Sequence, residues 1–170
     1  MYISHNEPEF FHWHDAELMQ VSAENNFMQW HVNTLNITKE NSQNSEGKDL
    51  CANNVKIIFK DCKIISLLSY GFESWQGGQL IANTEERYYS QSEILKFLEK
   101  MKQSSGWVCN LLDGNCIRED NFLHIGFELD FEYMRESFFR LELVCSEFTA
   151  EWETYSGTAW YEQVKQKPEK

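Results

Sequence analysis

The sequence predicts an α+β fold in which one main helix, at residues 90–103, packs against a mostly antiparallel, curved sheet of seven or eight strands. Two observations predict it. Segments of alternating apolar and polar residues recur along the chain between turn residues, which is typical of half-buried strands. One segment alone has the apolar period of a helix. Because successive strands read as hairpins, we expect a half-barrel or sandwich in meander order.

The length and composition indicate one domain over residues 1–170. A chain of 170 residues with 42% hydrophobic content can bury a sizeable core. It contains no run of eighteen apolar residues, and its start lacks the basic and apolar regions of a signal peptide. We therefore expect a cytoplasmic protein with no membrane association.

The first strands, within residues 17–38, form a hairpin around Asn25-Asn26, since asparagine tolerates the positive φ of a two-residue turn. This turn would place six apolar residues on one face, and polar residues on the other. The facing pairs are then Ala23 with Met28, Val21 with Trp30, and Met19 with Val32.

Residues 39–54 are polar and predict a mobile loop with nothing to pack. Two β-rich runs follow, at 55–59 and 64–70, and predict a second hairpin across residues 60–63. The stretch 71–78 interrupts this pattern, and its pair Gly77-Gly78 is typical of a turn.

The helix at residues 90–103 is indicated by its start and by its apolar face. Ser90 and Glu93 have the S-x-x-E spacing of a capping box. The apolar positions follow the i, i+3, i+4, i+7 spacing of one helical face. They are Ile94, Phe97, Leu98 and Met101.

The C-terminal third predicts further strands. Asp113-Gly114 between apolar flanks, at 107–112 and 115–118, indicates a third hairpin. Residues 122–131 alternate cleanly, and residues 138–152 alternate until their parity changes, which indicates a β-bulge near Ser146-Glu147. The tail at 163–170 is expected to fray.

The charge favours some partners over others. Fifteen basic and twenty-seven acidic residues give a formal net charge of −12, which repels the phosphates of nucleic acid and attracts a basic protein. Alternatively, the acidity serves solubility alone. The five cysteines form no C-x-x-C pair, so we expect neither a disulfide framework nor a zinc knuckle, and no cofactor.

His12, His14 and Asp15 form one candidate cluster. Two imidazoles spaced by two residues on an extended segment, with a carboxylate beside them, are plausible metal ligands if His31 or His124 completes the set. A small metal-dependent or hydrolytic enzyme would use these side chains. In the alternative, Asp15 turns the chain into the first strand and the histidines form local contacts.

A second candidate lies near the C-terminus, where aromatic and acidic residues alternate in a turn-prone segment. This composition resembles that of protein interfaces. The alternative is that Trp152 and Trp160 close one end of the core. The candidate protein-binding residues are Trp152, Glu153, Tyr155, Trp160 and Tyr161.

The string F-x-x-H-D-A-x-L, at Phe11, His14, Asp15, Ala16 and Leu18, resembles the start of several small bacterial families of unknown function, some of them similar to immunity proteins of polymorphic toxins. The resemblance implies a cytosolic, non-enzymatic binder that neutralises a toxin. Together with the acidity, it favours an acidic protein-binding module with a basic partner. A carrier of small ligands is a further alternative, and would require an apolar cavity.

Overall fold

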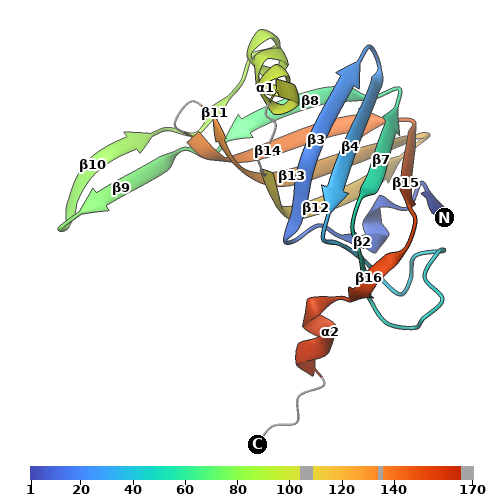
Figure 1. The fold of residues 1–170 in the computed structure, drawn as a ribbon. Helices are drawn as coiled ribbons and strands as arrows, with labels where there is room; N and C mark the ends of the chain where they lie inside the picture. The colour runs from blue at the N-terminus through green and yellow to red at the C-terminus, as the bar shows by residue number, and fades with distance from the viewer. Residues whose placement is uncertain (104–108, 134–135, 166–170) are drawn as a thin grey trace, which may run out of the picture.

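The structure, a computed structural model, describes residues 1–103, 109–133 and 136–165. It is an α+β fold, as expected, with a ten-stranded, a four-stranded and a two-stranded sheet, and every strand pair is antiparallel (Figure 1). The prediction of seven or eight strands is therefore too low. The ten-stranded sheet is open, because its outermost strands, β1 and β11, each pair on one side only.

The strands of the ten-stranded sheet do not follow chain order. In spatial order they are β1 (Tyr2–His5), β15 (Glu147–Trp152), β7 (Val55–Lys60), β4 (Phe27–Asn33), β3 (Ala16–Glu24), β12 (Cys109–Glu119), β13 (Phe122–Tyr133), β14 (Glu136–Cys145), β8 (Lys63–Ser69) and β11 (Arg87–Tyr88). The predicted meander is wrong as a description of the whole sheet.

This sheet folds into two layers at two corners. The chain passes from β7 to β8 through Asp61, which has a positive φ of 46°, and from β14 to β15 through Ser146. The two corners are joined, because the Ser146 backbone N–H donates to the Lys60 carbonyl at 3.0 Å. Strands β3, β4 and β7 consequently cross β8, β13 and β14 at a steep angle (Figure 1).

Aromatic rings fill the space between the layers. The Trp30 ring, from β4, lies 4.6 Å from the Phe127 ring, from β13, and 5.2 Å from that of Phe59. All three side chains are almost fully buried. The β-bulge predicted near Ser146-Glu147 is wrong, because one strand ends at Cys145 and another, with different partners, begins at Glu147. The parity change, with Cys145 and Phe148 both buried, comes from this corner between the layers.

The corners explain why the predicted second hairpin is wrong. β7 and β8 are consecutive in the chain, but β7 pairs with β4 and β15, whereas β8 pairs with β14 and β11. The polar residues of 60–63 look like a hairpin turn from sequence. They instead carry the chain from one layer to the other.

The predicted third hairpin is also wrong. β12 runs straight through Asp113-Gly114 and pairs with β13, with a register shift between Leu111 and Asp113. Gly114 is needed for a different reason, because a Cβ atom there would lie 2.3 Å from Cδ1 of the Trp13 indole. The turn between β12 and β13 falls at residues 120–121, where Asp120 has a positive φ of 53°. Trp107 lies outside the described residues.

The first hairpin, β3–β4, is confirmed around Asn25-Asn26, with Ala23 opposite Met28 and Val21 opposite Trp30. The third predicted pair is wrong. A register shift between Leu18 and Gln20 places Leu18 opposite Val32. Leu18 is therefore buried and Met19 is 38% exposed. A bulge that inserts one residue reverses the face of every residue beyond it.

The four-stranded sheet corrects the expectation that residues 39–54 have nothing to pack. Asn44 is buried, and its amide nitrogen donates to the carbonyls of Ile37, Thr38 and Lys48. The mobility of this range stays a prediction. The strands, in spatial order, are β16 (Tyr155–Thr158), β6 (Leu50–Ala52), β5 (Leu35–Ile37) and β2 (Phe11–His12). A short 3-10 helix, η1 (Pro8–Phe10), precedes β2.

Helix α1 (Gln91–Gln103) confirms the predicted helix and its apolar face. It packs on the open side of the two layers, where the Phe97 ring lies 5.4 Å from Phe131 and 5.1 Å from Phe139. On the other layer, the Lys102 ammonium donates to the Ala23 carbonyl at 2.8 Å. A second helix, α2 (Trp160–Lys165), includes the first part of the predicted frayed tail, while 166–170 lie outside the described residues.

A two-stranded arm projects from the body of the molecule (Figure 1). It consists of β9 (Phe72–Gln76) and β10 (Gln79–Thr84), joined at Gly77-Gly78. Both glycines have positive φ, so the predicted turn is confirmed. The sequence does not predict the arm itself, because its apolar residues face solvent: Trp75 and Ile81 are 59% and 57% exposed.

Candidate binding site

The N-terminal motif forms a turn that leads into β3. Phe11, Ala16 and Leu18 are buried in the core. The Ala16 N–H donates to the Trp13 carbonyl at 3.0 Å, and Asp15 adopts a positive φ of 65°. Most of the F-x-x-H-D-A-x-L string is therefore explained by packing and by this turn, as in the alternative interpretation of the sequence.

The two histidines of the motif make separate contacts. The His14 Nδ1 lies 2.7 Å from the Leu112 carbonyl oxygen, and the His12 ring lies 5.4 Å from the Tyr161 ring. The proposed third ligand His31 lies 2.9 Å from the Gln29 amide. In the part of the chain that the structure describes, no three His, Cys, Asp or Glu side chains are grouped so that they could hold a metal ion.

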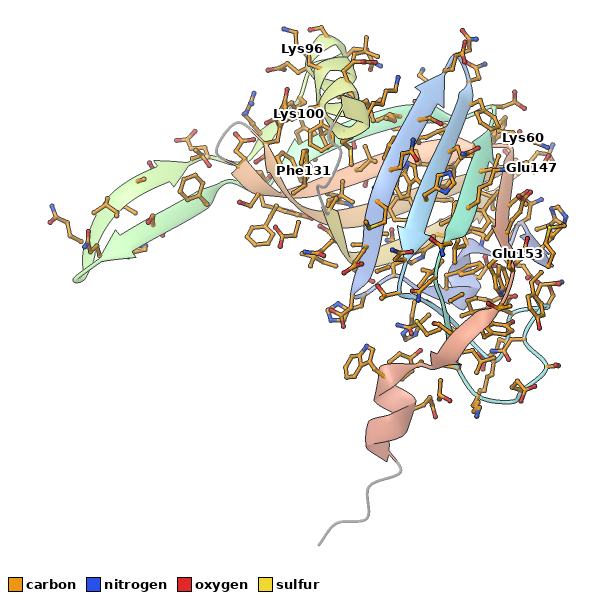
Figure 2. All side chains as sticks on the ribbon, in the orientation of Figure 1. Lys60, Lys96, Lys100, Phe131, Glu147 and Glu153 are labelled. Carbon is orange, nitrogen blue, oxygen red and sulfur yellow. The ribbon has the colours of Figure 1, made fainter. Side chains whose placement is uncertain are left out.

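The C-terminal candidate segment divides into buried and exposed residues. Trp152 is 2% exposed and stacks on Tyr2, as in the alternative in which it closes one end of the core, and its contact with a partner stays a prediction. Tyr155 is half-buried, donates to the Gln43 carbonyl, and has a pKa that burial raises to about 12. Glu153 lies on the surface beside β16 (Figure 2).

Trp160 and Tyr161 begin helix α2. Trp160 is 52% exposed, so the alternative that it closes the core is wrong for this residue. The Tyr161 hydroxyl donates to the Asp49 carboxylate at 2.9 Å, and burial together with this bond raises its pKa. Because the Tyr161 ring contacts His12, the N-terminal and C-terminal candidates lie side by side.

A surface depression of about 360 Å³ lies at this place. Its lining residues come from the start of β3 and from β5, β6, β16 and α2; Figure 1 shows β16 and α2 below the start of β3. The depression brings together Asp15 and Trp160, which the sequence predicts as members of two separate candidates. Its full lining is Asp15, Glu17, Thr34, Asn36, Cys51, Ser156, Gly157, Thr158 and Trp160.

The floor of the depression contains a buried polar side chain, that of Asn36. In β5, the neighbouring Leu35 and Ile37 point into the core, so the alternation of a strand directs Asn36 to the opposite face. Asn36 is 2% exposed. No described residue forms a hydrogen bond with its carboxamide, but solvent in the depression still reaches the polar atoms of this group, because the fully buried side-chain atoms without a partner are those of Trp30, Thr38 and Trp152.

The charged residues in the lining are both acidic. The Asp15 carboxylate lies 3.5 Å from the His14 Nε2, and both side chains are more than half exposed. Glu17 has no lysine or arginine partner in the described part of the chain, and no described lysine or arginine lines the depression. Carboxylates beside an exposed indole ring form a surface suited to a cation.

Sequence reasoning missed Glu17, Asn36 and Cys51. Asn36 could have been noticed, because it is a polar residue between two apolar ones in a short strand. Its role depends on β16 and α2, which are distant in sequence, so the pattern of β5 alone does not indicate a site. Glu17 begins the predicted first hairpin, and its sequence context does not single it out; in the structure it is half-buried in β3.

A second cavity, of about 510 Å³, lies between α1, the β3–β4 turn and the β7–β8 corner. Its lining includes Met28, Ile64, Ile94 and Leu98, together with the Cys62 thiol. Burial raises the pKa of Cys62 to about 12, so the thiol stays protonated near neutral pH and is a poor nucleophile. The cavity can accept an apolar group, and its one thiol is not activated for catalysis.

Comparison with known proteins adds no assignment: no protein family, no curated protein and no solved structure matches the chain. Among the described residues, no helix is long and apolar enough to span a membrane.

Proposed function

We propose that the protein is a non-enzymatic, acidic binding module that occupies a basic surface of a partner protein. The resemblance of its N-terminal motif extends the proposal to the class of immunity proteins, which neutralise toxins by binding them. The net charge of −12 supports a basic partner, because opposite charges accelerate association and disfavour acidic competitors.

One observation carries the proposal: Trp160 is 52% exposed beside a depression whose charged lining residues are Asp15 and Glu17. Exposed tryptophans are unusual, and at interfaces they contribute much of the binding free energy. An indole next to carboxylates that have no lysine or arginine partner among the described residues is complementary to the arginine and lysine side chains of a basic protein.

The alternative of a metal-dependent or hydrolytic enzyme has less support. His12 and His14 contact Tyr161 and Leu112 instead of converging on one point. General acid–base or metal catalysis requires side chains that meet at a reacting group. The N-terminal cluster instead contributes Asp15 to the depression.

The experiment that tests the proposal uses the product of the adjacent gene, since immunity proteins are encoded beside their toxins. Its affinity for the full chain is measured by calorimetry at about 50 mM and about 500 mM salt. We expect a basic partner whose affinity falls with salt, and falls at least about tenfold for Trp160→Ala.

The matched control is Trp75→Ala. Trp75 is exposed to a similar degree, 59%, but lies on the β9–β10 arm. We expect it to leave the affinity unchanged. An affinity that is independent of salt and equal in both variants, or the absence of any complex, contradicts the proposal.

The cavity under α1 favours a second candidate function, the carriage of a small apolar ligand, because it is lined by aliphatic side chains. Its test is the fluorescence of the apolar dye ANS with the wild type and with Leu95→Glu. Leu95 lines the cavity but is 56% exposed, so the substitution spares the core. Equal dye fluorescence with both proteins contradicts this candidate.

A further inference from the structure

The following inference rests on the proposed function and names the group that the site receives. We propose that the depression binds an arginine side chain of the partner, with the guanidinium against the Asn36 carboxamide, between the Trp160 ring and the carboxylates of Asp15 and Glu17.

The floor indicates a polar ligand group. A carboxamide that no protein group pairs, in a side chain that is otherwise buried, can exchange the water at its polar atoms for a polar ligand group. The Asn36 side chain is 2% exposed and lines the depression, and its carboxamide has no hydrogen-bond partner among the described residues although solvent reaches it from the depression. A ligand that reaches the floor with an N–H donor satisfies the carboxamide oxygen.

The walls indicate that this ligand group is cationic. Asp15 and Glu17 supply acceptors, and no described lysine or arginine in the lining competes for them. The Trp160 ring supplies a face with negative electrostatic potential, which attracts cations and repels carboxylates and phosphates. An anionic group is therefore disfavoured, and a neutral group leaves both carboxylates without an arginine or lysine partner.

The combination of floor and walls favours arginine over lysine. A guanidinium is planar, stacks on an aromatic ring and distributes five N–H donors around its edge. It can donate to Asn36 and to a carboxylate at the same time while its face contacts the Trp160 ring. A lysine ammonium is a compact, strongly hydrated charge. Removing its water when it enters a partly closed site costs more free energy than removing that of a guanidinium.

The test is a titration of the uniformly ¹⁵N-labelled full chain with N-acetyl-arginine amide, followed by NMR. The matched probes are the citrulline compound, which is nearly isosteric and uncharged, and the lysine compound. We expect arginine to shift the indole N–H of Trp160 and the side-chain amide of Asn36. Citrulline should bind at least about tenfold more weakly, since it lacks the charge.

Two conservative variants keep the test independent of folding. Asp15→Asn tolerates the positive φ at this position, and Glu17→Gln changes a side chain at the surface of β3. Each should weaken the arginine response, and the two together should abolish it. Trp75→Ala should leave it unchanged.

The outcomes separate the inference from the proposed function. Equal shifts with arginine, lysine and citrulline, or shifts that survive the double substitution, overturn the inference even if the basic partner binds in a salt-dependent way. A specific arginine response without any salt-dependent partner complex supports the arginine site and contradicts the proposed function.

Discussion

Trp13 lies against the backbone of Gly114, and this contact fixes how the motif packs on β12. A Cβ at residue 114 would lie 2.3 Å from Cδ1 and 2.6 Å from Cγ of the indole. The ring cannot withdraw easily, because it is 2% exposed and packs edge-on against Phe127 at 4.9 Å. The residue therefore has to be glycine, although no turn occurs there.

Gly114→Ala should lower the free energy of unfolding by about 1–3 kcal/mol, the usual cost of overpacking a core. The measurement is urea unfolding. Gly157→Ala is the matched control, since no atom lies within 4 Å of a Cβ built there, and we expect a change below about 0.5 kcal/mol. Equal stability of the two variants would contradict the assigned role of Gly114.

Glu136 is a buried carboxylate that we expect to stabilise the fold through its hydrogen bonds. Its side chain is 7% exposed, and it accepts hydrogen bonds from Arg87, at 3.2 Å, and from the Tyr89 hydroxyl. Glu136→Gln should cost about 1–2 kcal/mol, at the lower end for charged hydrogen bonds because Arg87 is 39% exposed.

The control for Glu136 is Glu40→Gln. Glu40 pairs with Lys39 at 3.9 Å, and both side chains are more than half exposed. Its loss should change the unfolding free energy by less than about 0.5 kcal/mol. If thermal unfolding ranks the two substitutions equally, the buried network around Glu136 contributes nothing.

At the scale of the elements, the hydrogen bonds that cap the N-terminus of α1 depend on pH. The Glu93 carboxylate accepts from the Ser90 N–H, the Ser90 hydroxyl and Arg87. These bonds lower the pKa of Glu93 from 4.5 to about 2. Because the folded pKa is the lower one, the stabilisation is complete above pH 4.5 and is lost as the pH falls towards 2.

NMR titration of the Glu93 side chain should give a pKa of about 2 in the wild type and a higher value in Ser90→Ala, which removes one donor. Glu93→Gln should destabilise the protein at neutral pH and lose this effect as the pH falls towards 2. A wild-type pKa near 4.5 would show that the cap does not form in solution.

The β9–β10 arm is expected to be dispensable for stability. No residue of the arm belongs to the buried core. Replacing residues 74–82 by Asn-Gly, between the paired residues Glu73 and Asn83, should form a two-residue turn and leave the melting temperature within a few degrees. A large drop in a calorimetric scan would mean that the arm packs on the body of the protein.

Elements with strong local signals were predictable from sequence. The capping box and apolar stripe predict α1, and clean alternation predicts β13. The pairing of β7 and β8 was not predictable, because their partners are distant in sequence and residues 60–63 have the composition of a turn. Gly114 was misread because a glycine required by a distant indole looks like a glycine required by a turn.

The candidate site shows the same limit. Asp15 and Trp160 each stood out in their own segment, but their proximity follows from the place of β16 and α2 beside the start of β3. Asn36 carries no local signal of function. A site built from four separate stretches of chain becomes visible only when the fold is known.

At the scale of the whole molecule, charge and aromatic contact should act on different rate constants. The net charge of −12 attracts a basic partner over a distance, so salt and Glu17→Gln should mainly slow association. Trp160→Ala should mainly speed dissociation, because the indole acts after contact. Stopped-flow kinetics separates the two, and the reverse assignment would contradict the role given to Trp160.

The two ends of the molecule present different surfaces. Figure 1 shows α1 and α2 at opposite ends of the molecule. Trp160 of α2 lines the depression, whereas Ile94 and Leu98 of α1 line the apolar cavity. The measurement that tests the central claim most directly is therefore NMR mapping of the bound basic partner on the full chain. We expect the largest shifts at Asp15, Glu17, Asn36 and Trp160. Shifts confined to α1 or to the β9–β10 arm, with the depression unchanged, would contradict it.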